Sequence, residues 1–179
     1  MRRVLGGAVV FSFLMAVAPA NADGSRIEAF AGYYFAEETD DDISFGGRYG
    51  WDSGNGWGLL ASYEAFEVDG PGYGIAREVE TEIQQVEVSW VAYPGGSGGG
   101  FDLFTGVGAA IVDVDHGVAD AVVDLDDTVV SVHAGAGYRF DLGDVVYLRP
   151  EVRLRGYDVG DETLDVTASI AIGFDFGGN

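Results

Sequence analysis

The segment YLRPEVRLRGYD, residues 147 to 158, decides the fold of this chain. Apolar and charged residues alternate along it: Leu148, Pro150, Val152 and Leu154 share one parity, and Arg149, Glu151, Arg153 and Arg155 share the other. A period of two is the repeat of a β-strand, in which successive side chains point to opposite faces. The segment therefore predicts a strand with one apolar and one charged face. The fold depends on which of these faces meets water.

The rest of the chain repeats this alternation in runs separated by Gly- and Asp-rich connections, which are typical of turns. The runs predict eight strands, at residues 26–36, 43–51, 57–68, 79–93, 101–112, 128–141, 145–157 and 165–176. Tight turns (52–56, 94–100, 142–144) alternate with mostly longer acidic connections (37–42, 69–78, 113–127, 158–163). Such a meander has two different ends. Within 79–93 the apolar parity shifts between Ile83 and Val86, which predicts a β-bulge at Gln84 and Gln85.

Residues 1–22 have the form of a secretory signal peptide. Arg2 and Arg3 precede an apolar run, and the segment ends in Ala20-Asn21-Ala22, an A-x-A cleavage pattern. The run is too short for a membrane-spanning helix. We therefore expect export, cleavage after Ala22 and one domain at residues 23–179. The chain has no cysteine, so this domain must be stable without disulfides.

The charge of the chain is strongly acidic. Thirty acidic residues and nine basic ones, all arginine, give a formal net charge of −21. This charge repels phosphate backbones, so nucleic acid is excluded as a direct partner. Six of the arginines lie on predicted strands rather than in connections: Arg26, Arg48, Arg139, Arg149, Arg153 and Arg155.

Alternation alone does not say which face is outside. A soluble eight-stranded barrel, secreted or periplasmic, turns its apolar face inward around an apolar ligand, whereas a membrane barrel turns that face to lipid. Aromatic residues gather at the ends of the predicted strands, as at Trp51, Trp57 and Trp90, and such girdles mark the two membrane interfaces. The absence of lysine also argues against a soluble surface. We therefore predict an all-β, eight-stranded antiparallel up-and-down transmembrane β-barrel, with the soluble barrel as the alternative.

Four segments carry a resemblance to a known family: EAFAGYYF (28–35), HAGAGYRF (133–140), LRPEVRLRGY (148–157) and SIAIGFDF (169–176). Together with the signal sequence they resemble the small outer-membrane β-barrels of the OmpA/OmpX type from Gram-negative bacteria. The resemblance covers the whole of 23–179. It implies a location in the outer membrane, a monomer, and contact with the lipids and lipopolysaccharide of that membrane. Family members usually end on an aromatic residue, whereas Phe176 is followed here by Gly-Gly-Asn.

The inward charges of such a barrel must be paired, because burial of a lone ion costs several kcal/mol. Side chains roughly fill an eight-stranded lumen. We predict a lumen charge network formed by Arg48, Glu64, Arg139, Arg149, Glu151, Arg153 and Arg155. Glu28, Asp102 and Asp175 are further candidates from other strands. A polar plug and a narrow ion or solute channel both fit such a network.

Signals for catalysis or a cofactor are thin. Ser131 and His133 share a strand face, which suits a nucleophile and its base, but the alternation turns both toward the lumen and away from lipid. We therefore expect no enzymatic activity and no cofactor.

Carboxylates in the segment 113–127 are weak candidates for divalent cations, because such cations favour oxygen ligands. These candidates are Asp113, Asp115, Asp124, Asp126 and Asp127. The spacing of an EF-hand is absent, and a solvated acidic loop is the alternative. The sequence thus predicts a structural, adhesive or membrane-stabilising barrel whose acidic external loops bridge to lipid phosphates through divalent cations.

Overall fold

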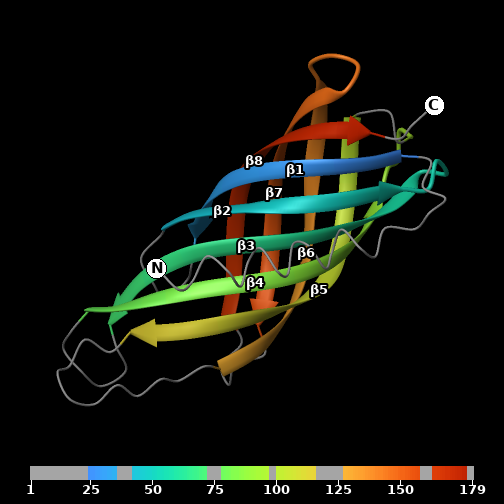
Figure 1. The fold of residues 1–179 in the computed structure, drawn as a ribbon. Helices are drawn as coiled ribbons and strands as arrows, with labels where there is room; N and C mark the ends of the chain where they lie inside the picture. Colours follow the sequence, from blue (N-terminus) through green and yellow to red (C-terminus); the bar gives the residue numbers. More distant parts are fainter. Residues whose placement is uncertain are drawn as a thin grey trace.

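The strands follow one another around a closed barrel in chain order, and the last strand pairs with the first in the computed structural model (Figure 1). Residues 24–35, 42–71, 78–96, 100–115, 127–157 and 163–176 are described. The strands are β1 (Gly24–Phe35), β2 (Asp42–Asp52), β3 (Trp57–Pro71), β4 (Glu78–Ala92), β5 (Gly100–Asp115), β6 (Asp127–Asp141), β7 (Val146–Tyr157) and β8 (Thr163–Phe176). No helix long and apolar enough to cross a membrane occurs in these parts of the chain.

Closure depends on the pairing of β1 with β8. These two strands pair antiparallel from Ser25–Phe176 to Phe35–Val166. A closed sheet leaves no row of unpaired backbone groups, which is a requirement for any sheet that meets hydrocarbon. The predicted eight-stranded antiparallel up-and-down barrel is therefore confirmed. The end of the barrel that carries the connections 53–56 and 142–145 is called the turn end below, and the end reached by Phe35 and Tyr157 is called the loop end.

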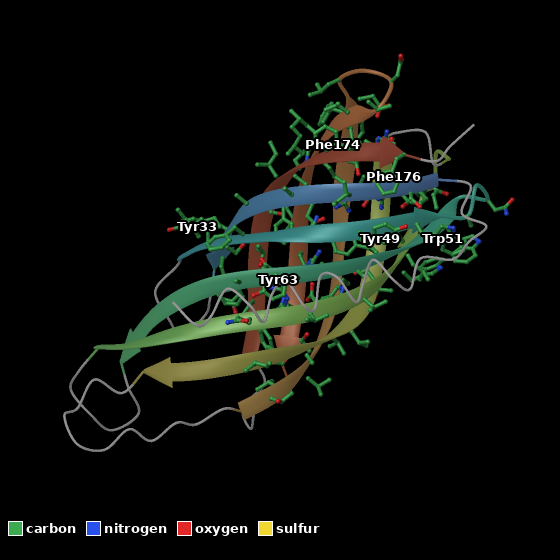
Figure 2. The ribbon with its side chains drawn as sticks, in the orientation of Figure 1. Tyr33, Tyr49, Trp51, Tyr63, Phe174 and Phe176 are labelled. Carbon is green, nitrogen blue, oxygen red and sulfur yellow. The ribbon has the colours of Figure 1, made fainter. Side chains whose placement is uncertain are left out.

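The strand β7 shows which face of the barrel is outside. Val152 and Leu154 are 51% and 46% exposed on the outside, whereas Arg149, Arg153 and Arg155 are at most 1% exposed inside. Exposed apolar side chains cover the outer surface of the other strands as well (Figure 2). Charged groups inside and apolar groups outside are the reverse of a soluble protein, and such a surface is stable in hydrocarbon rather than in water.

Aromatic rings gather toward both ends of the outer surface. Figure 2 shows Tyr33 near the loop end, and Tyr49, Trp51 and Phe176 near the turn end. Several of these rings contact one another: Trp51 and Trp57 are in edge contact with centroids 5.1 Å apart, and Tyr33 and Phe35 with centroids 4.8 Å apart. This arrangement fits the two interfacial girdles expected from the sequence.

The predicted bulge at Gln84 and Gln85 is wrong. Pairing of β4 with both neighbours is continuous through these residues, with Gln85 opposite Glu64 and Ala110. The apolar parity changes because Ile83 points inward, where it packs against Tyr34 and Phe66. An apolar residue inside a polar lumen, rather than an extra residue in the strand, is the physical reason for the irregular pattern.

Two acidic connections are shorter than the sequence suggested. The strand β3 continues to Pro71 and β5 continues to Asp115, and β6 already begins at Asp127. Residues 113–115, which were expected in a loop, therefore lie in a strand.

The substitution Leu154→Arg tests the orientation of the faces. It should lower the free energy of folding into lipid vesicles by about 2–4 kcal/mol, because the charge would enter hydrocarbon. A matched control is Leu142→Arg, since Leu142 lies in the β6–β7 connection and a charge near an interface costs at most about 1 kcal/mol. Urea titrations in vesicles measure both values. Equal costs for the two variants would show that the apolar face does not meet lipid.

Candidate functional site: the charge network of the lumen

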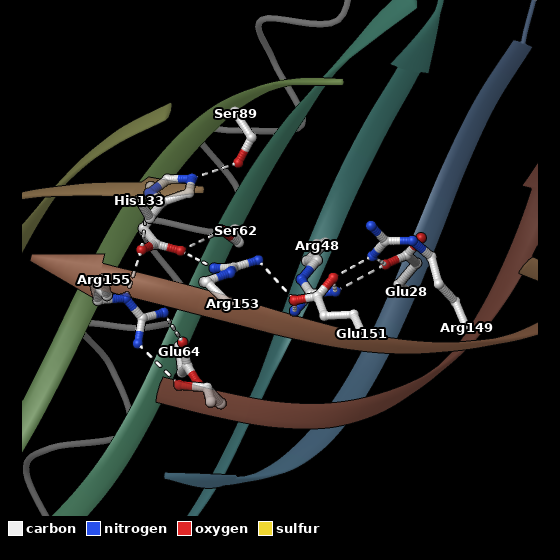
Figure 3. A network of polar contacts seen from close by, with 12 residues as sticks. Glu28, Arg48, Ser62, Glu64, Ser89, His133, Arg149, Glu151, Arg153 and Arg155 are labelled. Atoms are coloured by element: carbon white, nitrogen blue, oxygen red, sulfur yellow. Dashed lines mark hydrogen bonds and ion pairs between the residues drawn. The ribbon is translucent and has the colours of Figure 1, made fainter. Parts of the chain in front are cut away.

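Glu151 on β7 is the centre of an ion-pair network inside the barrel (Figure 3). Its two oxygens accept hydrogen bonds from both terminal nitrogens of Arg48, at 2.6 Å and 2.9 Å. Arg153 donates to the same carboxylate at 2.9 Å, and Arg149 also donates to it. All four side chains are nearly or fully buried, so the carboxylate and its three guanidinium groups depend on one another for solvation.

Glu87 on β4 is the second acidic centre. Its Oε1 accepts a hydrogen bond from Arg155 Nε at 2.9 Å, and Arg153 donates to Oε2. The Nδ1 atom of His133 lies 3.2 Å from Oε1 of Glu87. Arg155 also donates to Glu64 at 2.6 Å and to the hydroxyl of Thr167 at 3.3 Å.

The network extends toward the turn end through two more carboxylates. Asp102 accepts two parallel hydrogen bonds from Arg149, at 2.8 Å and 2.7 Å, which is the bidentate geometry that favours arginine over lysine. Glu28 accepts from Arg48 at 3.3 Å and from the hydroxyl of Tyr147 at 2.8 Å. With Glu28 on β1, Thr167 on β8 and the groups between them, every strand of the barrel contributes at least one side chain.

Aromatic rings and a glycine fit around the guanidinium groups. The Arg48 guanidinium lies 3.9 Å from the centroid of the Phe30 ring. The Arg153 guanidinium lies 5.1 Å from the centroid of the Phe104 ring. Such contacts stabilise a desolvated cation. Gly137 leaves room for Arg149, since a Cβ atom at residue 137 would lie 2.9 Å from Arg149 Nε.

Apolar layers lie on both sides of the network. Toward the turn end, Leu60, Val91, Tyr93 and Phe104 form one buried cluster. Toward the loop end, Tyr34 and Phe66 stack with centroids 4.3 Å apart, and Ile83 packs against them. Contact with these clusters reduces the water around the neighbouring ions, which strengthens their mutual attraction.

The structure brings together six of the seven residues predicted for the network: Arg48, Glu64, Arg149, Glu151, Arg153 and Arg155. Arg139 lies apart, at the turn end, where it pairs with Asp141 at 2.6 Å and also with Asp175. Sequence reasoning missed Glu87. The outward parity of Val88 and Trp90 would have placed Glu87 inside.

Ser131 and His133 both face the lumen, but they are not partners. The hydroxyl beside the imidazole belongs to Ser89, whose Oγ lies 2.8 Å from His133 Nε2. With Glu87 these residues have the order of a catalytic triad, yet Ser89 is 0% and His133 4% exposed. A hydroxyl in this place is shielded from the lipid outside the barrel.

The candidate cation ligands lie elsewhere. Asp113 and Asp115 are in β5 and Asp127 is the first residue of β6, whereas Asp124 and Asp126 lie outside the described residues. In the parts of the chain that the structure describes, no group of three or more His, Cys, Asp or Glu side chains is arranged to hold a metal ion.

Solved structures show what this barrel is similar to. The Pseudomonas aeruginosa OprF N-terminal β-barrel domain matches with a TM-score of 0.55 and 19% identity, over 87% of this chain and 98% of that chain. Neisserial surface protein A matches with a TM-score of 0.58 and 14% identity, over 85% and 97%. This chain has the fold of the small outer-membrane β-barrels.

A third barrel of this fold is Ail, the attachment invasion locus protein of Yersinia pestis. It matches with a TM-score of 0.56 and 14% identity, over 86% of this chain and 98% of that chain, in a structure with the heparin analogue sucrose octasulfate. No family model matches the sequence. No curated protein matches it either. The likeness therefore rests on three-dimensional structure, and it extends over nearly the full length of the barrels compared.

Replacement of the central carboxylate, Glu151→Gln, tests the network. The three guanidinium groups would lose a shared buried counter-charge, and we expect a loss of about 3–5 kcal/mol in unfolding free energy. The matched control is Asp141→Asn, because Asp141 is 41% exposed and an exposed pair contributes at most about 1 kcal/mol. Urea titration in vesicles gives both values. A cost for Glu151→Gln as small as that of the control would mean that the lumen charges are hydrated.

Proposed function

We propose that this protein is a monomeric, closed barrel of the outer membrane, with a structural and membrane-stabilising role and no transport activity. The observation that carries the proposal is the ion-pair network between two apolar layers. A lumen filled in this way holds the strands together and leaves little room for water.

The two rival functions fit the geometry less well. A soluble barrel that binds an apolar ligand needs an apolar chamber, but the lumen holds buried arginines and carboxylates, and the apolar residues face outward. A narrow channel needs a path along its axis that ions can enter and leave. Here Arg149, Arg153 and Arg155 are each held by at least two carboxylates, and an ion would have to displace these pairs and then cross an apolar layer.

Acidic residues at the loop end support a role for divalent cations. The register puts Glu67 opposite Glu82 and Glu82 opposite Asp113, and it puts Asp69 opposite Glu80 and Glu80 opposite Asp115. Like charges directly opposite each other on neighbouring strands are destabilising. In the proposed function, calcium or magnesium relieves this repulsion and connects these rows to the phosphates of lipopolysaccharide.

The same acidic rows disfavour a polyanionic partner. Ail was solved with a sulfated heparin analogue, but a chain with a formal charge of −21 repels such a ligand. Adhesion through this surface would need a cationic partner or bridging cations.

The absence of transport is tested in planar lipid bilayers at neutral pH. The purified protein should give no steady nanosiemens openings, because side chains occupy the whole lumen of an eight-stranded barrel. A porin of about 16 to 18 strands, which encloses an aqueous channel, serves as the positive control in the same bilayers. Large and lasting openings by folded protein would contradict the sealed lumen.

The cation role is tested by thermal unfolding in detergent at matched ionic strength. Calcium should raise the midpoint more than sodium does, because one divalent ion can neutralise two opposed carboxylates. The combined variant Glu80→Gln, Glu82→Gln, Asp113→Asn and Asp115→Asn should lose this difference, whereas Asp52→Asn at the turn end should keep it. If wild type responds equally to both salts, the carboxylates are only a solvated surface.

A further inference from the structure

An apolar groove runs across the outer surface of the barrel from β5 and β6, over β7 and β8, to β1 and β2. It has a volume of about 740 Å³ and is lined almost entirely by apolar atoms. Its lining includes small residues, among them Ala31, Ala136 and Ala168, and larger side chains such as Tyr33, Phe101 and Tyr138. Because the outer face meets lipid in the proposed function, whatever fills this groove comes from the membrane.

The groove lies over an interruption in the sheet. The pairing of β6 with β7 runs from Ser131–Tyr157 to Gly137–Glu151 and resumes only at Phe140–Leu148. Pro150 lies in this gap, and a proline has no N–H to give to a neighbouring strand. Pro150 also lines the groove, together with Gly137 and Glu151 from the two edges of the gap. The interrupted β6–β7 seam therefore lies within the groove, which extends from it to β5 on one side and over β8 to β1 and β2 on the other.

One end of the groove lies close to the turn end of the barrel. Tyr138 is three residues before the end of β6, and Phe101 is the second residue of β5. The neighbouring β6–β7 connection projects beyond the other strand ends (Figure 1). It carries two exposed apolar residues, Leu142 at 60% and Val145 at 53%, and the exposed Asp144 between them.

We propose that this groove binds an acyl chain of an aminophospholipid from the leaflet at the turn end. This inference rests on the proposed function, since it requires a barrel in the membrane. The chain fills the space over Ala136 and Ala168, and Leu142 and Val145 extend the apolar contact toward the interface. Asp144 complements the ammonium group of the lipid. In outer-membrane barrels the short turns are periplasmic, so the lipid is a phospholipid of the periplasmic leaflet.

Two other occupants fit less well. Lipopolysaccharide belongs to the leaflet at the loop end, whereas Phe101 and Tyr138 place one end of the groove close to the turn end. A second copy of this chain would meet its own formal charge of −21. Both remain outcomes of the test below.

The test uses the purified, folded protein in nanodiscs with a phosphatidylethanolamine that carries a diazirine on its acyl chain. After illumination, labelled peptides are located by mass spectrometry. We expect label to concentrate on β1, β6, β7 and β8. Label spread evenly around the barrel, label from a matching lipid A probe in place of the phospholipid, or protein–protein cross-links across β6 and β7 would each overturn the proposal.

Groove-filling variants give the second readout. Ala136→Leu with Ala168→Leu should lower labelling of β6 to β8 at least roughly fivefold, a change that corresponds to about 1 kcal/mol. The matched control is Ala61→Leu with Ala109→Leu, which enlarges two outward alanines away from the groove and should leave the labelling unchanged. Asp144→Asn should reduce the preference for phosphatidylethanolamine over phosphatidylglycerol. Equal labelling of the filled and control variants contradicts the proposal.

Failure of this inference can be told apart from failure of the proposed function. Flotation with vesicles and a change in gel mobility on heating report membrane insertion and barrel closure independently of any labelling. Protein that inserts and closes but shows uniform label overturns the groove alone. Protein that neither inserts nor floats overturns the membrane barrel, and the groove with it.

Discussion

The need to pair buried guanidinium groups governs this structure. Arg48, Arg149, Arg153 and Arg155 are at most 1% exposed, and each has a carboxylate within hydrogen-bonding distance. A single unpaired ion in such a place costs several kcal/mol. The carboxylates come from β1, β3, β4, β5 and β7, so the charges can be satisfied only when distant strands stand in one register around a common axis. Pairing of the charges therefore depends on closure of the barrel.

The other features of the barrel follow from a charged interior. With ions inside, the apolar residues must face outward, and a surface of exposed Ile, Leu, Val and Phe is stable only against lipid. Long arginines need space, and glycines such as Gly137 on the inner face provide it. The chain needs no disulfide, because the closed backbone ladder and the shared ion pairs connect all eight strands.

Alternation made most of the fold predictable from the sequence. In β7 and β8 the outer face is apolar and the inner face is mostly charged, polar or small, with Tyr147 and Ala171 as the buried apolar residues, so the strands and their inner faces could be read directly. In β4 the same rule failed, because Ile83 is an apolar residue on the inner face. The sequence shows that an apolar residue breaks the parity, but not that Phe66 lies opposite Ile83 on the neighbouring strand or that Tyr34 of β1 joins the same cluster.

The candidate site was predictable in membership but not in geometry. Strand parity indicates which charges face inward, and six of the predicted residues meet in the network. Parity does not indicate how far along the barrel axis a side chain lies. Arg139 was therefore predicted to belong to the network, whereas it lies at the turn end and pairs with Asp141 and Asp175. Parity also does not show that Glu151 contacts three arginines, or that Glu87 contacts two arginines and a histidine. These contacts depend on the curvature of the barrel.

A double-mutant cycle between Arg155 and Glu64 tests the central claim most directly. The two side chains come from β7 and β3, and their atoms lie 2.6 Å apart with no more than 2% of either side chain exposed. Unfolding free energies in vesicles are compared for Arg155→Met, Glu64→Gln and the combined variant. If the two ions are shielded from water and depend on each other, the losses of unfolding free energy in the two single variants add up to more than the loss in the combined variant. The difference is a coupling energy of about 1–3 kcal/mol. Additivity within about 0.5 kcal/mol would mean that each charge is solvated by itself, as in a water-filled pore, and would contradict this account.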